Sequence, residues 1–206
     1  MTGFSFRAAI CFGITVALMP VAHAHHMMDG EAPNTLLDGM LSGLAHPVIG
    51  LDHFAFVTAV GLVAFATGRV VAIPAVFVLA TIVGAVIHLF GIDLPFAEPV
   101  IILSLFLAGI LLLIQPRAPY GLWGALFALT AVFHGYAYGE SIVGSEATPL
   151  VSYFAGFAFI QFVIAICVAK LAQQVFNLRY LAARIGGGLV ACVGALLIFG
   201  LMPTFG

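Results

Sequence analysis

Residues 46–69 read HPVIGLDHFAFVTAVGLVAFATGR, and this stretch combines an apolar helix with ionisable side chains. From Leu51 onward it is long and apolar enough to form most of a membrane-spanning helix, which needs about 20 residues. Its beginning nevertheless carries His46, Asp52 and His53. Burying such side chains in a membrane is costly unless they are paired or bind a ligand. The stretch therefore indicates a helical membrane protein with a functional site near one end of its first span.

The composition of the whole chain agrees with a membrane protein. The 206 residues are 64% hydrophobic and 7% charged, with a mean hydropathy of +1.24, whereas soluble domains carry roughly 25% charged residues. The net charge is −2 and there is no basic patch, so nucleic acid is not expected as a partner. The length suits one bundle of helices rather than two domains.

The N-terminus is typical of a secretory signal. Arg7 precedes an apolar run at 8–19 that is too short to cross a membrane comfortably, and the small-residue pattern AHA follows at 22–24. We therefore expect residues 1–24 to be a cleavable signal peptide; the alternative is an uncleaved first helix.

The few remaining charges divide the chain into uncharged runs of about the length of a membrane-spanning helix. These runs are 70–92, 99–116, 118–139, 147–169 and 185–206. With a first span near 48–68, they predict an all-α integral membrane protein, a six-helix transmembrane bundle over residues 48–206. A periplasmic segment, 25–47, would precede it. Two polar stretches, 34–45 and 170–184, are expected to form short interfacial helices.

The signs of the charges alternate from loop to loop. The basic residues of the expected mature chain fall at Arg69, at Arg117 and in the 170–184 loop, whereas the loops 91–98 and 140–149 carry only acidic residues. The positive-inside rule places the basic loops in the cytoplasm. We therefore expect a multi-pass protein of the bacterial inner membrane with both mature termini in the periplasm.

Candidate metal ligands gather at the outer ends of the expected spans. They are His46, Asp52, His53, His88, His134 and Glu140. Imidazole and carboxylate ligands suit borderline divalent ions, namely Ni²⁺, Co²⁺, Zn²⁺ or Cu²⁺. His25 and His26 would open the mature chain, where they either capture metal or form only a solvated tail. For the inner half, the sequence offers only uncharged polar side chains, at Thr81, Ser104, Thr130 and Gln161.

Two motifs resemble the HupE/UreJ family of bacterial nickel and cobalt permeases. They are HPVIGLDH at 46–53 and FHGYAYGE at 133–140. The resemblance extends to the leader and to six subsequent spans. It implies uptake of Ni²⁺ or Co²⁺ across the inner membrane. It also implies metal handling by His46, Asp52, His53, His134 and Glu140.

The expected function is therefore a permease for a divalent transition metal, most simply Ni²⁺ or Co²⁺, and not an enzyme. No prosthetic group is expected. The main alternative is an intramembrane zinc-dependent hydrolase that uses Asp52 or Glu140 as a base on bound water. A haem carrier and a metal sensor without transport are further alternatives. The expected partners are the metal ion and the lipid bilayer; a homo-oligomer and a periplasmic or cytoplasmic metal chaperone stay open.

Overall fold

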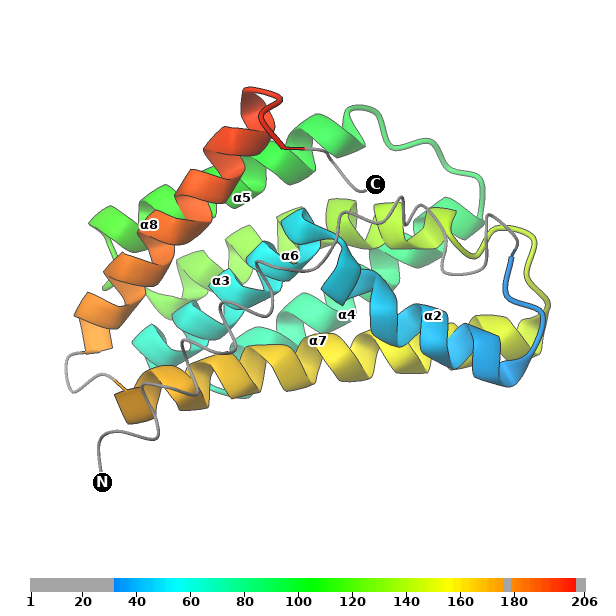
Figure 1. Cartoon of the computed structure of the whole chain (residues 1–206), viewed down its shortest axis with the longest axis horizontal. Helices are drawn as coiled ribbons and strands as arrows, with labels where there is room; N and C mark the ends of the chain where they lie inside the picture. The colour runs from blue at the N-terminus through cyan, green and yellow to red at the C-terminus, as the bar shows by residue number, and fades with distance from the viewer. Residues whose placement is uncertain (1–31, 176–178, 203–206) are drawn as a thin grey trace.

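The computed structural model describes residues 32–175 and 179–202, and every regular element in these ranges is an α-helix (Figure 1). The helices are α2 (Leu36–Ile49), α3 (Leu51–Thr67), α4 (Ala72–Leu89), α5 (Ala97–Ile114), α6 (Tyr120–Glu140), α7 (Ala147–Val175) and α8 (Arg179–Ile198). The predicted all-helical class is confirmed for this part of the chain. The expected signal peptide, 1–24, and the His25-His26 tail lie outside the described residues.

The charge pattern located helices α4 to α8, with differences at their ends. Helix α7 continues to Val175, and α8 already begins at Arg179. The described part of the stretch 170–184 therefore belongs to these two long helices. The expectation of a separate interfacial helix there is wrong.

The first expected span is broken at Gly50. This residue has extended backbone angles (φ −68°, ψ 110°) and serves both as the C-cap of α2 and the N-cap of α3. The two helices meet at 79°. Pro47, near the end of α2, has no backbone N–H to continue a helical ladder. Helix α3 therefore covers most of the span expected near 48–68, and the break lies at its start.

Helix α2 begins with a well-formed cap and packs along α7 as a parallel neighbour (Figure 1). The side chain of Thr35 accepts from the backbone N–H of Asp38, and the Asp38 carboxylate accepts from the backbone N–H of Thr35. The predicted helix near 34–45 is thus present, but it is longer than expected. It also joins the bundle instead of standing apart from it.

Several helices are suited to cross a membrane. By length and composition, α4, α5, α7 and α8 qualify among the described residues, and the bent pair α2–α3 counts as a fifth crossing if it is one broken span. Helix α6 is long enough, but His134 and its tyrosines and glycines make it less apolar. A multi-pass membrane protein follows, whereas the number of six spans stays a prediction.

Glycines bring the helices together in three close pairs. The pairs are α4 with α6, α2 with α7, and α5 with α8. A Cβ added at certain glycines would meet main-chain atoms of the partner helix, so the two backbones are in direct contact. These glycines are Gly84 and Gly135 between α4 and α6, Gly43 and Gly156 between α2 and α7, and Gly109 and Gly187 between α5 and α8.

Helix α3 occupies the centre of the bundle. Of its 17 residues, 13 are buried, and they face α7, α8, α5 and α4. A helix that is apolar on all sides is expected to be enclosed by others. Because α3 begins with Asp52 and His53, its central position carries these two polar side chains into the interior.

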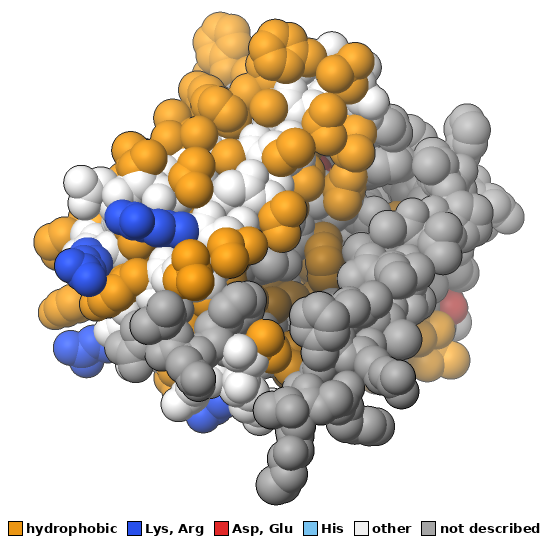
Figure 2. Space-filling view, turned by 60° about the vertical axis from the view of Figure 1, so that its left-hand side comes forward, with side chains coloured by type: hydrophobic (Ala, Val, Ile, Leu, Met, Phe, Trp, Pro, Cys, Tyr) orange, Lys and Arg blue, Asp and Glu red, His pale blue; other side chains and the backbone are white. Residues whose placement is uncertain are grey.

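Basic side chains gather at one end of the bundle (Figure 2). The Arg69 guanidinium lies 4.7 Å from the ring centroid of Tyr120, and that of Arg117 lies 4.5 Å from the ring centroid of Tyr180. Each arginine is thus held over an aromatic face. The acidic loops between α4 and α5 and between α6 and α7 lie at the other ends of these helices.

Candidate metal-binding site

Two histidines from different helices meet inside the bundle. His53 lies in the first turn of α3, and His134 lies about two turns before the end of α6. Their Nδ1 atoms are 3.2 Å apart, and both side chains are fully buried. The sequence placed the candidate ligands of both motifs at the outer ends of the expected spans. The structure brings one residue of each motif, His53 and His134, into contact.

The surroundings of His134 hold its ring in place. The Phe56 ring stacks on it with a centroid distance of 4.1 Å and an interplanar angle of 28°. The next residue on α6 is Gly135, against which the backbone of α4 packs at Thr81. Phe56 is itself fully buried. The imidazole therefore sits in a dry, closely packed environment in which its orientation is fixed by its neighbours.

Ser104 of α5 fixes where the protons of the two imidazoles lie. Its Oγ donates to the Ile101 carbonyl at 2.7 Å and lies 3.1 Å from His134 Nε2. We assign its one hydrogen to the carbonyl, so that Ser104 accepts from the Nε2–H of His134. A neutral His134 then has a lone pair on Nδ1, and this lone pair accepts from the Nδ1–H of His53.

This chain of hydrogen bonds leaves the Nε2 atom of His53 without a proton. That nitrogen is buried and has no hydrogen-bond partner among the described residues. Buried polar atoms are nearly always paired, so an unpaired one calls for an explanation. An unprotonated imidazole nitrogen is also the form of histidine that binds metals. The geometry therefore presents one nitrogen donor inside the bundle.

Two tyrosines connect this histidine pair to α2 and α7. The ring of Tyr138 lies 4.5 Å from the His53 ring and 5.0 Å from the His46 ring, measured between centroids. The Tyr153 hydroxyl donates to the Tyr138 carbonyl at 2.9 Å and lies 3.3 Å from His46 Nδ1. The rings of His46 and His53 are 5.6 Å apart. His46 is thus brought next to the pair although the helix between them is broken.

An oxygen of the Asp52 carboxylate and the ring of His53 both lie close to Gly50. A Cβ added at Gly50 would lie 3.1 Å from Asp52 Oδ1 and 2.7 Å from His53 Cδ2, the ring carbon bonded to Nε2. Asp52 Oδ1 is buried and unpaired among the described residues, as is the hydroxyl of Tyr138. Leaving such groups unpaired costs about 1–3 kcal/mol each. Asp52 Oδ1 and His53 Nε2 are thus two buried acceptor atoms without a partner among the described residues, on neighbouring residues at the start of α3.

The other candidate ligands lie away from the histidine pair. Glu140 is exposed at the end of α6. His88 is partly buried near the end of α4, with its ring 4.4 Å from the Tyr136 ring, and its Nδ1 atom is buried without a partner in the described chain. Within residues 32–175 and 179–202, no three His, Cys, Asp or Glu side chains form a group that could hold a metal ion. The role of the candidates as metal ligands stays a prediction.

Sequence reasoning did not identify two of the residues that shape this site. Ser104 was expected to line the inner half of a path, but it contacts His134 directly. Tyr153 was not identified at all. The only signal for Ser104 is a lone hydroxyl in the apolar run ILSLFLAG at 102–109. Helix packing decides which of several such hydroxyls reaches a histidine, and packing is not visible in the sequence of one helix.

Fold and site together define a multi-pass helical membrane protein with a buried imidazole pair beside a helix break. The chain belongs to the HupE/UreJ family: the profile described as "HupE / UreJ protein" matches residues 13–197. The chain is also 34% identical over 188 residues to "Protein HupE" of Rhizobium leguminosarum bv. viciae, covering 90% of this chain and 94% of that protein. No solved structure matches. The family resemblance inferred from the two motifs is confirmed.

Proposed function

We propose that this protein is a secondary transporter that takes up a divalent transition metal across the bacterial inner membrane. The favoured substrates are Ni²⁺ and Co²⁺. The observation that carries the proposal is the buried His53–His134 contact, which leaves the Nε2 atom of His53 as an unpaired donor. This donor lies next to the break at Gly50. Interrupted helices form the substrate sites of many transporters. Uptake of Ni²⁺ or Co²⁺, the role that membership of the HupE/UreJ family implies, agrees with this proposal.

The donor chemistry favours a borderline divalent ion. His53 Nε2 would supply the nitrogen ligand, and the Asp52 carboxylate would supply an oxygen ligand and a negative charge. His134 acts through His53, because it accepts the Nδ1 proton and so keeps Nε2 free. A site with few protein ligands leaves coordination positions to water and releases its ion more readily than a closed tetrahedral site. This property suits a carrier.

The proposed topology has six crossings with both mature termini in the periplasm. The pair α2–α3 is one broken crossing, and α4 to α8 supply the other five. The arginines at the ends of α3 and α5 then face the cytoplasm, as the positive-inside rule requires. The break at Gly50 falls inside the first crossing, where non-helical backbone is tolerated only if protein or a water-filled cavity surrounds it.

In the proposed transport path, residues at the outer ends of the helices capture the metal ion. Glu140, exposed at the end of α6, and His88, near the end of α4, face an ion that approaches from the periplasm. The His25-His26 pair extends this capture role to the mature N-terminus. A divalent cation that moves inward gains about 4.6 kcal/mol per 100 mV of membrane potential, at about 2.3 kcal/mol per elementary charge. The membrane potential alone is therefore sufficient to drive uptake.

Uptake of Ni²⁺ and Co²⁺ into proteoliposomes under an imposed potential tests the proposal. The wild type is expected to accumulate one or both ions, and His53→Gln to lose uptake by about tenfold or more. Ser152→Ala is the matched control, because it removes a buried hydroxyl that donates a hydrogen bond to the Pro149 carbonyl and packs against Gly39 of α2, away from the histidines. Metal binding without uptake in the wild type would reject the transporter.

A further inference from the structure

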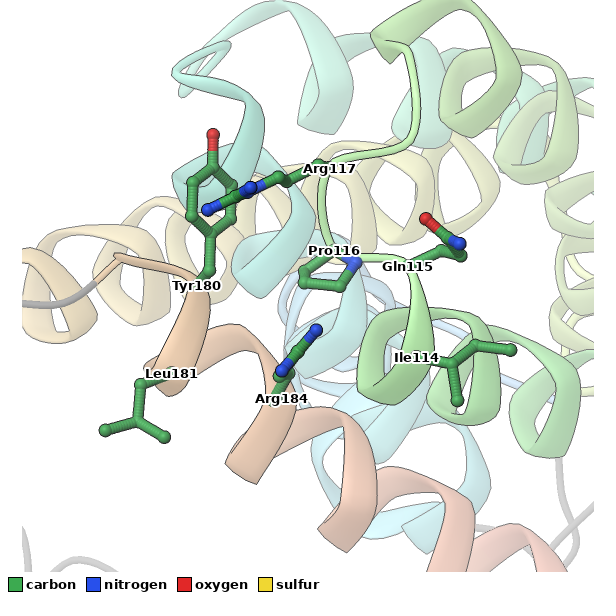
Figure 3. A pocket seen from close by; sticks show the side chains of 7 residues that line it. All are labelled: Ile114, Gln115, Pro116, Arg117, Tyr180, Leu181 and Arg184. Atoms are coloured by element: carbon green, nitrogen blue, oxygen red, sulfur yellow. The ribbon is translucent and has the colours of Figure 1, made fainter.

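A cleft at the basic end of the bundle lies outside the proposed metal path. It has a volume of about 370 Å³ and opens between the end of α5, the loop that follows it and the first turns of α8 (Figure 3). Its lining residues are Ile114, Gln115, Pro116, Arg117, Tyr180, Leu181 and Arg184. Neither the histidine pair nor any other candidate metal ligand contributes to it.

Two arginines on different elements give this cleft its charge. Arg117 comes from the loop after α5 and Arg184 from α8, and both line the same cavity. Within the described ranges, neither forms a salt bridge or a side-chain hydrogen bond, and the acidic loops lie at the opposite ends of these helices. Each guanidinium carries five N–H donors. The cleft therefore offers many donors and two positive charges without a counter-charge from the described residues.

The Arg117 side chain is also held in position. Its guanidinium lies 4.5 Å from the ring centroid of Tyr180, and Figure 3 shows it reaching across that ring while Arg184 rises from α8 toward Pro116. Stacking on one face leaves the N–H edge of a guanidinium available for an anion. Two such forks on a preformed cleft match a phosphate group, whose oxygens accept pairs of parallel hydrogen bonds.

We propose that this cleft binds the phosphate group of an anionic phospholipid from the cytoplasmic leaflet. The neighbouring apolar side chains favour a lipid over a soluble phosphate compound. Ile114, Leu181 and Ile185 are 57%, 47% and 48% exposed, and they flank the cleft on α5 and α8. An acyl chain has apolar surface to lie on there, whereas a soluble phosphate has none to gain. The leaflet assignment rests on the proposed topology, but the binding itself does not rest on metal transport.

Lipid binding to purified protein tests this site. Phosphatidylglycerol and phosphatidylcholine are titrated onto detergent-solubilised wild type, and bound lipid is counted by native mass spectrometry. Arg117→Gln/Arg184→Gln is compared with Arg69→Gln, which removes one charge at the same end of the bundle but outside the cleft. We expect the wild type and Arg69→Gln to prefer phosphatidylglycerol, and the double variant to lose that preference by about tenfold or more.

Two further measurements keep the test decisive. Inorganic phosphate is added as a competitor, and the lipid proposal expects it not to displace phosphatidylglycerol at equal concentration. Displacement, or equal phosphatidylglycerol binding by the wild type and the double variant, would overturn the proposal. The single variant Arg184→Gln, which leaves the Arg117–Tyr180 contact intact, replaces the double variant if the latter does not fold. Because no metal is present, the result is independent of Ni²⁺ or Co²⁺ uptake.

Discussion

Replacing Ser104 with alanine tests the link between the hydrogen-bond chain and metal binding. In the wild type, Ser104 Oγ accepts from His134 Nε2 at 3.1 Å, and this contact determines which imidazole nitrogens carry protons. Without the hydroxyl, the Nε2–H of His134 would be buried and unpaired, at a cost of about 1–3 kcal/mol. The two imidazoles avoid part of this cost if the shared hydrogen bond between their Nδ1 atoms reverses.

The reversal has a direct consequence for the donor nitrogen. When the Nδ1–H of His134 donates to His53, the neutral His53 ring must carry its own proton on Nε2. The lone pair on His53 Nε2 then disappears. A metal ion must displace this proton before it binds. We expect Ser104→Ala to weaken Ni²⁺ binding by about 10–100-fold, the usual range for losing a group that orients a ligand.

Ser152→Ala is the control for this experiment. Ser152 is buried like Ser104, and its hydroxyl also donates to the carbonyl three residues earlier, at 2.9 Å, but it contacts no histidine. Calorimetric titration with Ni²⁺ gives the dissociation constants, and thermal unfolding in the same detergent gives the relative stabilities. Equal dissociation constants for the two variants, with Ser104→Ala properly folded, would refute the proton assignment and with it the role of Ser104.

Three other substitutions probe the packing and the outer residues. Gly135→Ala should cost about 1–3 kcal/mol and lower the unfolding temperature, because the added methyl meets the backbone of α4; Gly124→Ala, with nothing within 4 Å, should be neutral or slightly stabilising. Gly50→Ala should lower the rate of metal uptake by a larger fraction than it lowers the unfolding temperature. The reason is local, since the added Cβ would lie 2.7 Å from His53 Cδ2. Glu140→Gln should raise the KM for uptake and leave the maximal rate within about twofold. The proposed role of this exposed side chain is to capture the ion at the outer surface, not to move it past the buried histidines.

Charge spacing in the sequence was sufficient to find the long helices. Each of α4 to α8 contains most of one uncharged run, because a charge inside a membrane span is costly and charges therefore mark the ends of spans. The helices themselves extend past these marks, since α7 includes Lys170 and α8 includes Arg179 and Arg184. The same reasoning placed His53 and His134 at a common depth, and the two rings do meet at 3.2 Å between Nδ1 atoms. In a chain with so few charges, depth along a span is readable from the sequence.

The break at Gly50 was not predictable in the same way. The residues Val48 to Leu51 are apolar apart from the glycine, and Pro47 before them is compatible both with the first turn of a helix and with a break. What stabilises the break is tertiary: α2 packs along α7 through Gly43 and Gly156, and this contact fixes α2 at 79° to α3. His46 nevertheless lies beside His53 across the break, with their ring centroids 5.6 Å apart.

The protonation of the proposed metal donor, His53 Nε2, depends on side chains from three helices. Ser104 belongs to α5, His134 to α6 and His53 to α3, and each step of the chain depends on the one before. Separating α5 from α6 by little more than one ångström would break the 3.1 Å contact, since hydrogen bonds weaken steeply beyond about 3.5 Å. The His53 nitrogen would then no longer be held unprotonated. If His53 Nε2 is the metal donor, as proposed, its affinity for the ion therefore depends on the spacing of α5 and α6, and a larger spacing favours release.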